Sequence, residues 1–307
     1  MSSYRRSSGQ IQTLGSQAFG DSDHQIDLVV VRFSQRMETI RWHRTTRMTA
    51  RVVGAAVLAA SLVSSPALAE DPEPDRWTIT IAPYFWAAGI KGDVGVGNVD
   101  ADVDVSFNDI RKDLTFGGML LSEARKDRLG FFFAPLYVRL GDESHPGPFD
   151  IDVTSDMAVV GGGAFYRVAE WNIGRPEEGR SRKAWIEPLA GLRYTYLRVD
   201  IDVDGPLGLN PDADKHRDWV DPIIGASAGI DLSEHWVLTA EGDIGGFGVG
   251  SDFTWNAVGL ISYQTSLFGI ATQLAAGYRA LSWDYDHDNF KWDVVMHGPV
   301  VGAIFRF

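Results

Sequence analysis

The sequence has no cysteine, no apolar segment long enough to cross a bilayer as a helix, and few basic residues after position 69. Without cysteine, a disulfide framework and a thiol nucleophile are both excluded. The longest apolar run, Val52–Val63, is well short of the ~20 residues that a membrane helix needs. Residues 70–307 hold 20 Lys and Arg against 37 Asp and Glu. This acidity argues against nucleic acid as a partner, because binding it requires clustered cations.

The apolar run belongs to a segment organised like a secretory signal. Arg51 precedes it, and the small residues of Ala67-Leu68-Ala69 follow it. A charged start, a short hydrophobic stretch and a small-x-small cleavage site are typical of a signal peptide. We therefore predict a signal peptide at residues 48–69, cleaved after Ala69, and export of the remainder.

A signal peptide this deep in a chain is unusual, and residues 1–47 are polar, arginine-containing and without periodicity. Two interpretations follow. Translation begins at Met37 or Met48, or it begins at Met1 and residues 1–47 form a disordered extension. In both cases residues 70–307 are long enough for one β-barrel or β-sandwich domain.

Segments in which apolar and polar residues alternate between turn signals fill residues 70–307 and predict an all-β fold. The ten predicted strands are Trp77–Val96, Leu114–Arg125, Leu129–Leu140, Ile151–Ala169, Trp185–Val203, Trp219–Leu232, Trp236–Phe247, Phe253–Gln264, Phe268–Trp283 and Phe290–Phe307. The tight connections between them are Lys126-Asp127, Ser233–His235 and Thr265-Ser266. The longer connections, acidic or rich in Gly and Pro, are Gly141–Asp150, Asp204–Asp218 and Asp284–Asn289.

Two segments do not fit this alternation of short and long connections. Glu170–Ala184 is long for the tight side. Gly97–Asp113 contains Asp100, Asp102 and Asp104 in alternation with apolar residues, as an eleventh strand would. Because up-and-down barrels have an even number of strands, we expect an external hairpin arm or an inward-folded loop here. About ten strands are predicted, with eight or twelve as alternatives.

The chain ends in the sequence GPVVGAIFRF, which places Val301, Ala303, Phe305 and Phe307 on one side of the last predicted strand. This ending, together with the signal peptide and the alternating strands, resembles bacterial outer-membrane β-barrels of the OmpA-like or porin-like type. Short pieces such as Tyr84-Phe85-Trp86 look like parts of uncharacterised proteobacterial members.

The resemblance implies a transmembrane, antiparallel, up-and-down β-barrel located in the outer membrane. It implies contact with outer-membrane lipid and lipopolysaccharide, and no cofactor. It also implies that Phe305 and Phe307 form the signal read by the barrel assembly machinery. The oligomeric state stays open.

The tryptophans after residue 69 all fall at or near the ends of predicted strands, which is typical of the aromatic belts at both membrane interfaces. The predicted periplasmic belt is Trp77, Trp171, Trp185 and Trp236, and the predicted outer belt is Trp86, Trp219, Trp255, Trp283 and Trp292. From Trp77 to Trp86, nine steps of ~3.3 Å at ~40° tilt give ~23 Å of height, close to the ~25 Å apolar band of such barrels.

Because a Lys or Arg on the lipid face costs ~2–4 kcal/mol near mid-bilayer, the polar face of each strand is expected to point inward. The predicted lumen charges are Glu123, Arg125, Arg139, Arg167, Glu187, Arg193, Glu241, Asp243 and Arg279. Acids and bases are nearly matched, which predicts a salt-bridged plug in a narrow interior. A narrow channel for small solutes uses the same residues and is the alternative.

Few patterns point to further chemistry. Asp200, Asp202 and Asp204 copy the first half of a calcium loop, but Pro211 stands where a bidentate Glu is required, so they are a weak candidate and no metal site is predicted. His216 and His287 lie near aspartates in predicted external loops, which leaves an outer-membrane enzyme as a second alternative. We predict no enzyme, but an envelope protein with a structural or interaction role.

Overall fold

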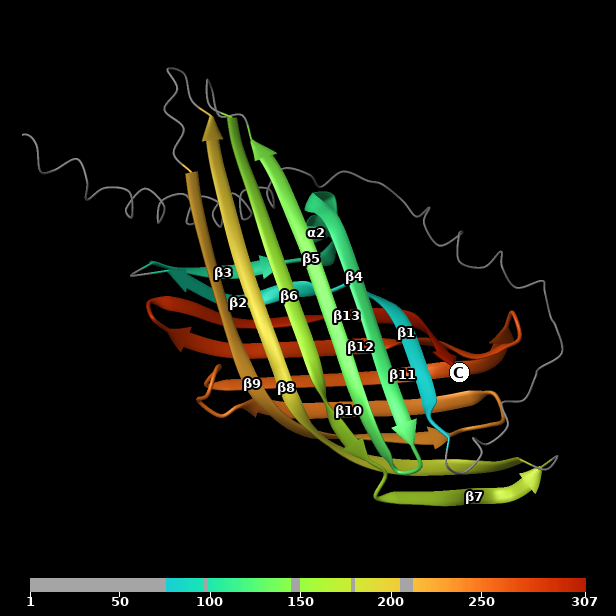
Figure 1. Ribbon diagram of the computed structural model, residues 1–307. Coiled ribbons are helices and arrows are strands. Elements are labelled where there is room, and N and C mark those ends of the chain that lie inside the picture. The colour runs from blue at the N-terminus through green and yellow to red at the C-terminus, as the bar shows by residue number, and fades with distance from the viewer. Residues whose placement is uncertain (1–75, 97–98, 145–149, 178–179, 205–211) are drawn as a thin grey trace, which may run out of the picture.

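The computed structural model describes residues 76–96, 99–144, 150–177, 180–204 and 212–307 (Figure 1). The predicted signal peptide at 48–69 and the predicted extension at 1–47 lie outside these residues. None of the helices in the described part of the chain is long and apolar enough to cross a bilayer.

The described residues form thirteen strands and one short helix. The strands are β1 Thr78–Trp86, β2 Gly89–Val96, β3 Val99–Val105, β4 Leu114–Lys126, β5 Leu129–Ser144, β6 Asp150–Tyr166, β7 Ala169–Glu177, β8 Arg180–Asp204, β9 Asp212–Asp231, β10 Trp236–Gly246, β11 Phe253–Leu267, β12 Ile270–His287 and β13 Phe290–Arg306. The helix is α2, Phe107–Asp113. Each of the ten predicted strands is present, within a few residues at most boundaries.

Ten of these strands close into an antiparallel barrel, which confirms the predicted fold class. The order around the barrel is β1, β4, β5, β6, β8, β9, β10, β11, β12 and β13. Closure occurs at β1, where Ile81 pairs with Ser122 of β4 on one edge and with Phe305 of β13 on the other. In Figure 1, β4, β5, β6 and β8 run steeply across the front, and β10 to β13 cross behind them at a large angle.

The first predicted strand, Trp77–Val96, is interrupted at Ala87–Ala88. Its two parts, β1 and β2, pair with successive stretches of β13, so that Trp86 is opposite Val300 and Gly89 is opposite His297. On its other edge β2 carries β3, which stands outside the closed ring of ten strands. A hairpin arm is therefore present, but it begins earlier than predicted: its first strand, β2, lies inside the predicted strand Trp77–Val96, and only β3 and α2 lie within Gly97–Asp113.

Connections differ from the prediction at both ends of the barrel. The tight turn between β11 and β12 lies at Phe268-Gly269, not at Thr265-Ser266, and both turn residues have positive φ. The long link Glu170–Ala184 is an extra hairpin, in which β7 pairs with the first residues of β8. Where the structure describes them, the acidic segments predicted as long loops continue as paired strands, at Gly141–Ser144, Asp212–Asp218 and Asp284–His287. Polar alternation does not stop backbone pairing in water. Residues 145–149 and 205–211 of these segments lie outside the described residues.

Candidate functional site

The half of the lumen near the C-terminus and the tight turns, called the lower half below, contains the first group of predicted charges. Arg125 of β4 donates two hydrogen bonds to Glu187 of β8, at 2.5 and 3.0 Å. Arg167, which follows β6, donates to the same carboxylate at 2.7 Å. Arg167 also contacts Glu170 of β7 at 2.7 Å. The Glu187 carboxylate therefore joins β4, β8 and the end of β6 near the end of the barrel where the chain terminates.

A second group of polar side chains crosses the lumen above Glu187. Arg193 donates to Asp243 at 2.6 Å, and the side chains of this pair are only 5% and 3% exposed. Asn256 donates to the same Asp243 at 3.0 Å and accepts a bond from Arg279 at 3.0 Å. Arg279 in turn donates to Tyr84 of β1 at 2.9 Å. This network links β8, β10, β11, β12 and β1, and it satisfies charges that would be costly to bury alone.

Between these groups lies a cavity of about 80 Å³. One wall is apolar and is built from side chains of β5, β6 and β8, including Phe132, Val159 and Leu189. The lining also carries Glu123 of β4 and Glu241 of β10, the remaining two acids predicted to face inward. A cavity of this size holds only a few water molecules.

Arg139 is the exception among the nine predicted lumen charges. It lies on the outward face of β5 and donates to Asp156 of β6 at 2.7 Å, next to the Tyr137 hydroxyl, which donates to the same carboxylate at 2.6 Å. Its side chain is 47% exposed. The prediction is wrong for Arg139 because this part of β5 is ten residues from the tight end, about where ~25 Å of apolar band ends.

The upper half of the lumen is apolar rather than charged. The buried cluster there includes Trp86, Leu136, Trp219, Leu281 and Trp283. Trp283 of β12 donates from its indole nitrogen to Thr195 of β8 across the barrel, at 3.2 Å. The predicted polar plug is therefore only the lower part of a filled interior.

Five of the predicted belt tryptophans point inward. They are Trp86, Trp185, Trp219, Trp283 and Trp292. Trp86, Trp219 and Trp283 are at most 6% exposed, and Arg167 lies over the ring of Trp185 at 5.2 Å. The interfacial assignment does not hold for these five. Nine steps separate Trp77 from Trp86, and an odd number of steps places two residues on opposite faces of a strand.

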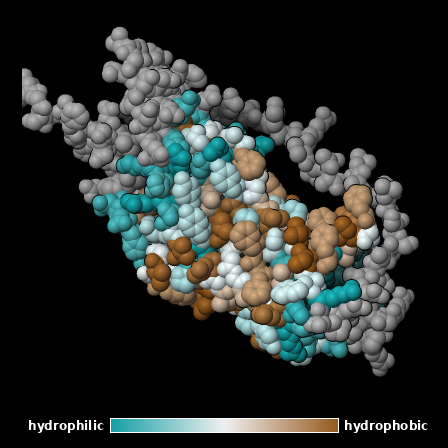
Figure 2. All heavy atoms as spheres, in the orientation of Figure 1, coloured by the Kyte–Doolittle hydropathy of each residue, from teal (hydrophilic) through white to brown (hydrophobic). Residues whose placement is uncertain are grey.

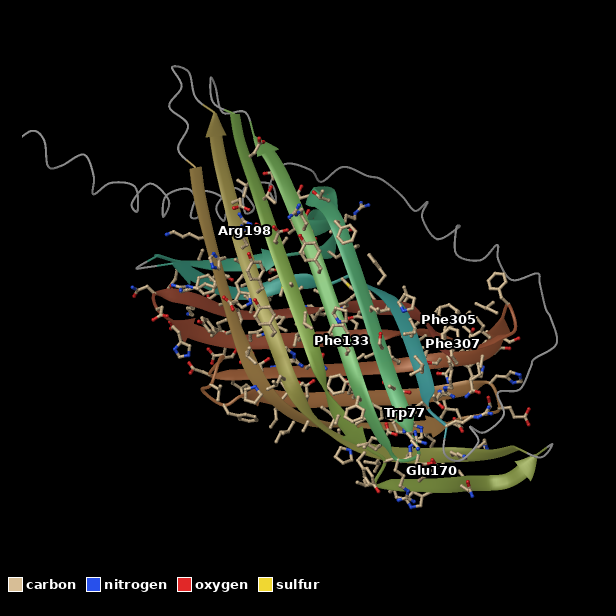
Figure 3. The ribbon with its side chains drawn as sticks, viewed as in Figure 1. Trp77, Phe133, Glu170, Arg198, Phe305 and Phe307 are labelled. Atoms are coloured by element: carbon tan, nitrogen blue, oxygen red, sulfur yellow. The ribbon has the colours of Figure 1, made fainter. Side chains whose placement is uncertain are left out.

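Trp77, Trp171 and Trp236 are between 44% and 52% exposed, and Trp255 lies on the outward face of β11. The outward aromatic residues outside the predicted belts include Phe85, Phe131, Phe133, Tyr194 and Tyr278. The alternation along each strand could have identified them, because residues in step with an outward-facing neighbour also face outward. The tryptophan positions used for the predicted belts did not follow this alternation. In Figure 3, Trp77, Phe305 and Phe307 gather at one end of the barrel, and Arg198 lies toward the other.

One further buried lumen residue lies outside the predicted charge network. Asp221 of β9 is fully buried and accepts bonds from the Trp219 indole at 3.1 Å, and from the Ser251 backbone and hydroxyl at 2.6 and 3.0 Å. Ser251 belongs to the connection between β10 and β11. Asp221 therefore holds this connection against the outer end of the apolar cluster.

The weak calcium candidate is not a loop. Asp200, Asp202 and Asp204 lie along β8, which is paired on both sides with β6 and β9 up to Asp202. An extended strand cannot wrap oxygens around one ion. Within the described residues, no group of three or more acids and histidines is arranged to hold a metal. His216 stacks on Tyr196, and His287 lies 3.7 Å from Asp252.

The outer end of the sheet carries a row of aspartates that face one another across four strands. Asp102 of β3 is opposite Asp93 of β2, Asp93 is opposite Asp293 of β13, and Asp293 is opposite Asp284 of β12. Like charges directly opposite across strands destabilise a sheet. Burial and the carboxylates of Asp293, Asp252 and Asp286 raise the pKa of Asp284 above its usual value.

No protein-family model and no curated protein matches the chain. Among solved structures, the attachment invasion locus protein Ail of Yersinia pestis is similar at 12% identity and a TM-score of 0.32, over 75% of this chain and 98% of Ail. Neisserial surface protein A is similar at 17% identity and 0.25, over 75% and 97%. The toluene transporter TodX of P. putida is similar at 10% and 0.22, over 77% and 90%. At these values the likeness supports no conclusion about activity.

Replacing Arg193 by Met is expected to lower the free energy of unfolding by roughly 3–5 kcal/mol, because Asp243 then stays buried without its cation. Lys112→Met, which removes a cation whose partner Asp109 is itself 48% exposed, is the control and is expected to have a clearly smaller effect, because exposed ion pairs contribute little. Urea unfolding in detergent micelles, followed by tryptophan fluorescence, measures both. The double variant Arg193→Met with Asp243→Leu should recover much of the loss. Equal costs for the two single variants would contradict the buried pair.

Replacing Asp284 by Asn is expected to raise the urea midpoint at neutral pH. The folded pKa of Asp284 is raised, so the folded state binds more protons than the unfolded state just above the ordinary Asp pKa. Stability is therefore lost as pH rises through that window, and the gain from Asn disappears when pH falls below it. Asp127→Asn, in the tight turn after β4, is the control and should give no such gain. A gain that persists in acid would argue against repulsion within the row.

Proposed function

We propose that this protein is an integral outer-membrane β-barrel with a closed lumen and a non-enzymatic structural or interaction role in the envelope. The observation that carries the proposal is the reversal of polarity across the barrel wall. Large apolar residues on the outward face are exposed, while charged residues such as Arg193 and Asp243 are buried inside. In water this arrangement is unfavourable, and in hydrocarbon it is the favourable one.

The height of the exposed apolar surface fits a bilayer. Trp77 and Phe85 both lie outward on β1 and are 52% and 47% exposed. The eight steps between them correspond to ~26 Å of strand, or ~20 Å of height at ~40° tilt, against an apolar band of ~25 Å. Figure 2 shows hydrophobic residues across the middle of the visible face, with hydrophilic residues gathered beyond them at the upper end.

Closure of the lumen at three levels favours a plugged barrel over a channel. Arg125, Arg167 and Glu187 join the walls near the tight end, the Arg193–Asp243 network crosses the middle, and the apolar cluster with Trp283 fills the upper half. An ion moving through would have to displace buried pairs and then enter an apolar core.

Membrane lipid and lipopolysaccharide follow as partners from this location. Phe307, which is 62% exposed, pairs with Ile79 through two backbone hydrogen bonds at 3.1 and 2.9 Å. Phe305 is two residues away on the same outward face. We propose these two residues as the feature that the assembly machinery reads.

Brominated acyl chains should quench part of the tryptophan fluorescence of the protein in vesicles. The lipid-facing indoles within the apolar band are those of Trp77 and Trp236. Substituting both by Phe should remove most of the quenchable signal, whereas Trp171→Phe, in the β7 hairpin beyond the barrel, should not. Absence of quenching in the unsubstituted protein, or a folded state that stays dissolved without detergent or lipid, would overturn the membrane proposal.

Purified protein inserted into planar bilayers should show no reproducible conductance steps. Insertion is checked by flotation of the same protein with liposomes, and a general porin treated identically sets the detection limit. Steady open steps of uniform size would favour the narrow channel instead. Silence together with confirmed insertion supports the plugged barrel.

A further inference from the structure

One edge of β3 lies outside the closed ring of ten strands. β3 pairs with β2 from Val99 to Val105, and within the described residues no strand pairs with its other edge. β4, which would be the next strand around the barrel, is paired with β1 only as far as Pro83 and Leu120. A strand edge of seven residues presents a row of backbone donors and acceptors that can pair with another strand.

This edge lies beyond the apolar band. The inner end of β3, at Val105, is opposite Ile90 of β2, and Ile90 is opposite Met296 of β13. Met296 is eleven residues from the last residue of the chain, which corresponds to ~36 Å of strand, or ~28 Å of height against a band of ~25 Å. The edge is therefore in water, where unpaired backbone groups are tolerated and a soluble partner has access to them.

The side chains of β3 define which partner fits. Asp100, Asp102 and Asp104 share one face of the strand and are exposed. The opposite face carries Ala101, Val103 and Val105, which are half-buried or buried. A strand added beside β3 would thus meet carboxylates on one face and small apolar side chains on the other.

These charges also argue against a second copy of the chain as the partner. Antiparallel pairing of β3 with itself places aspartates beside aspartates on the same face, and like charges opposite one another are destabilising. The sheet behind β3 extends the repulsion, because Asp93 and Asp293 continue the row. A basic strand meets attraction at the same positions.

We propose that the free edge of β3 is a docking site for an extended peptide segment in which Lys or Arg alternates with apolar residues. The segment adds to the sheet as a further strand: its backbone pairs with β3, its cations face Asp100 and Asp102, and its apolar residues continue the face of Val103. Affinity in such strand addition comes from main-chain hydrogen bonds, and specificity comes from alternate side chains. The proposal goes beyond the envelope role. The access of a soluble partner rests on the proposed membrane location, whereas pairing with the edge itself is tested in detergent, where a failure would not bear on that location.

The test uses the full protein in detergent micelles and a fluorescent eight-residue peptide of alternating Val and Lys, with fluorescence anisotropy as the readout. Saturable binding at low ionic strength is expected. A peptide of the same sequence with alternate backbone nitrogens methylated should bind at least about tenfold more weakly, because methylation blocks pairing with a strand edge and leaves the charge unchanged. Alternating Val and Glu should not bind.

Variants of the protein separate the edge from the charged face. Asp100→Asn with Asp102→Asn should weaken binding about tenfold. The matched control, Asp93→Asn with Asp293→Asn, removes the same charge from the same face on strands already paired on both sides, and should have a clearly smaller effect. Equal loss in both double variants, or equal binding of the methylated peptide, would show attraction to the acidic face alone and would overturn the proposal. So would absence of saturable binding.

Discussion

The pairing of β1 with both β13 and β4 is the constraint on which the rest of the structure depends. It turns a row of neighbouring hairpins into a closed wall, so that around the tight end each backbone edge has a partner. Only a closed sheet can place its outward face against hydrocarbon, because lipid offers no hydrogen bonds to a free edge. β3 lies outside this ring and beyond the apolar band. Within the described residues one of its edges is unpaired, and the strand carries exposed aspartates.

Closure also creates an interior that must be filled, and the chain fills it in two different ways. The lower half uses shared carboxylates, with Glu187 bonded to Arg125 and Arg167, and Asp243 bonded to Arg193 and Asn256. The upper half uses large apolar side chains around Trp283. Each solution removes water and joins strands far apart in sequence, and a cavity of about 80 Å³ lies between the two groups of polar side chains.

The strands could be predicted because period-two alternation and turn residues are local signals, present within each segment. The positions of Trp86 and Arg139 could not be predicted with the same rules. Trp86 is of the residue type found in aromatic belts, but its position along β1 places it on the lumen face. Arg139 has a charge expected inside, but it stands where the outward face has already left the apolar band. Parity and height both depend on the register of neighbouring strands.

By itself the sequence determined the fold class, the ten barrel strands and the concentration of charge on one face of many of them, since these follow from the order of apolar and polar residues. Only the tertiary structure decided which charges meet, that the upper lumen is apolar, that Asp221 holds the connection after β10, and that β3 is left with a free edge. These features arise from contacts between residues up to 195 positions apart. Closure of the sheet brings such residues together, and no local pattern encodes it.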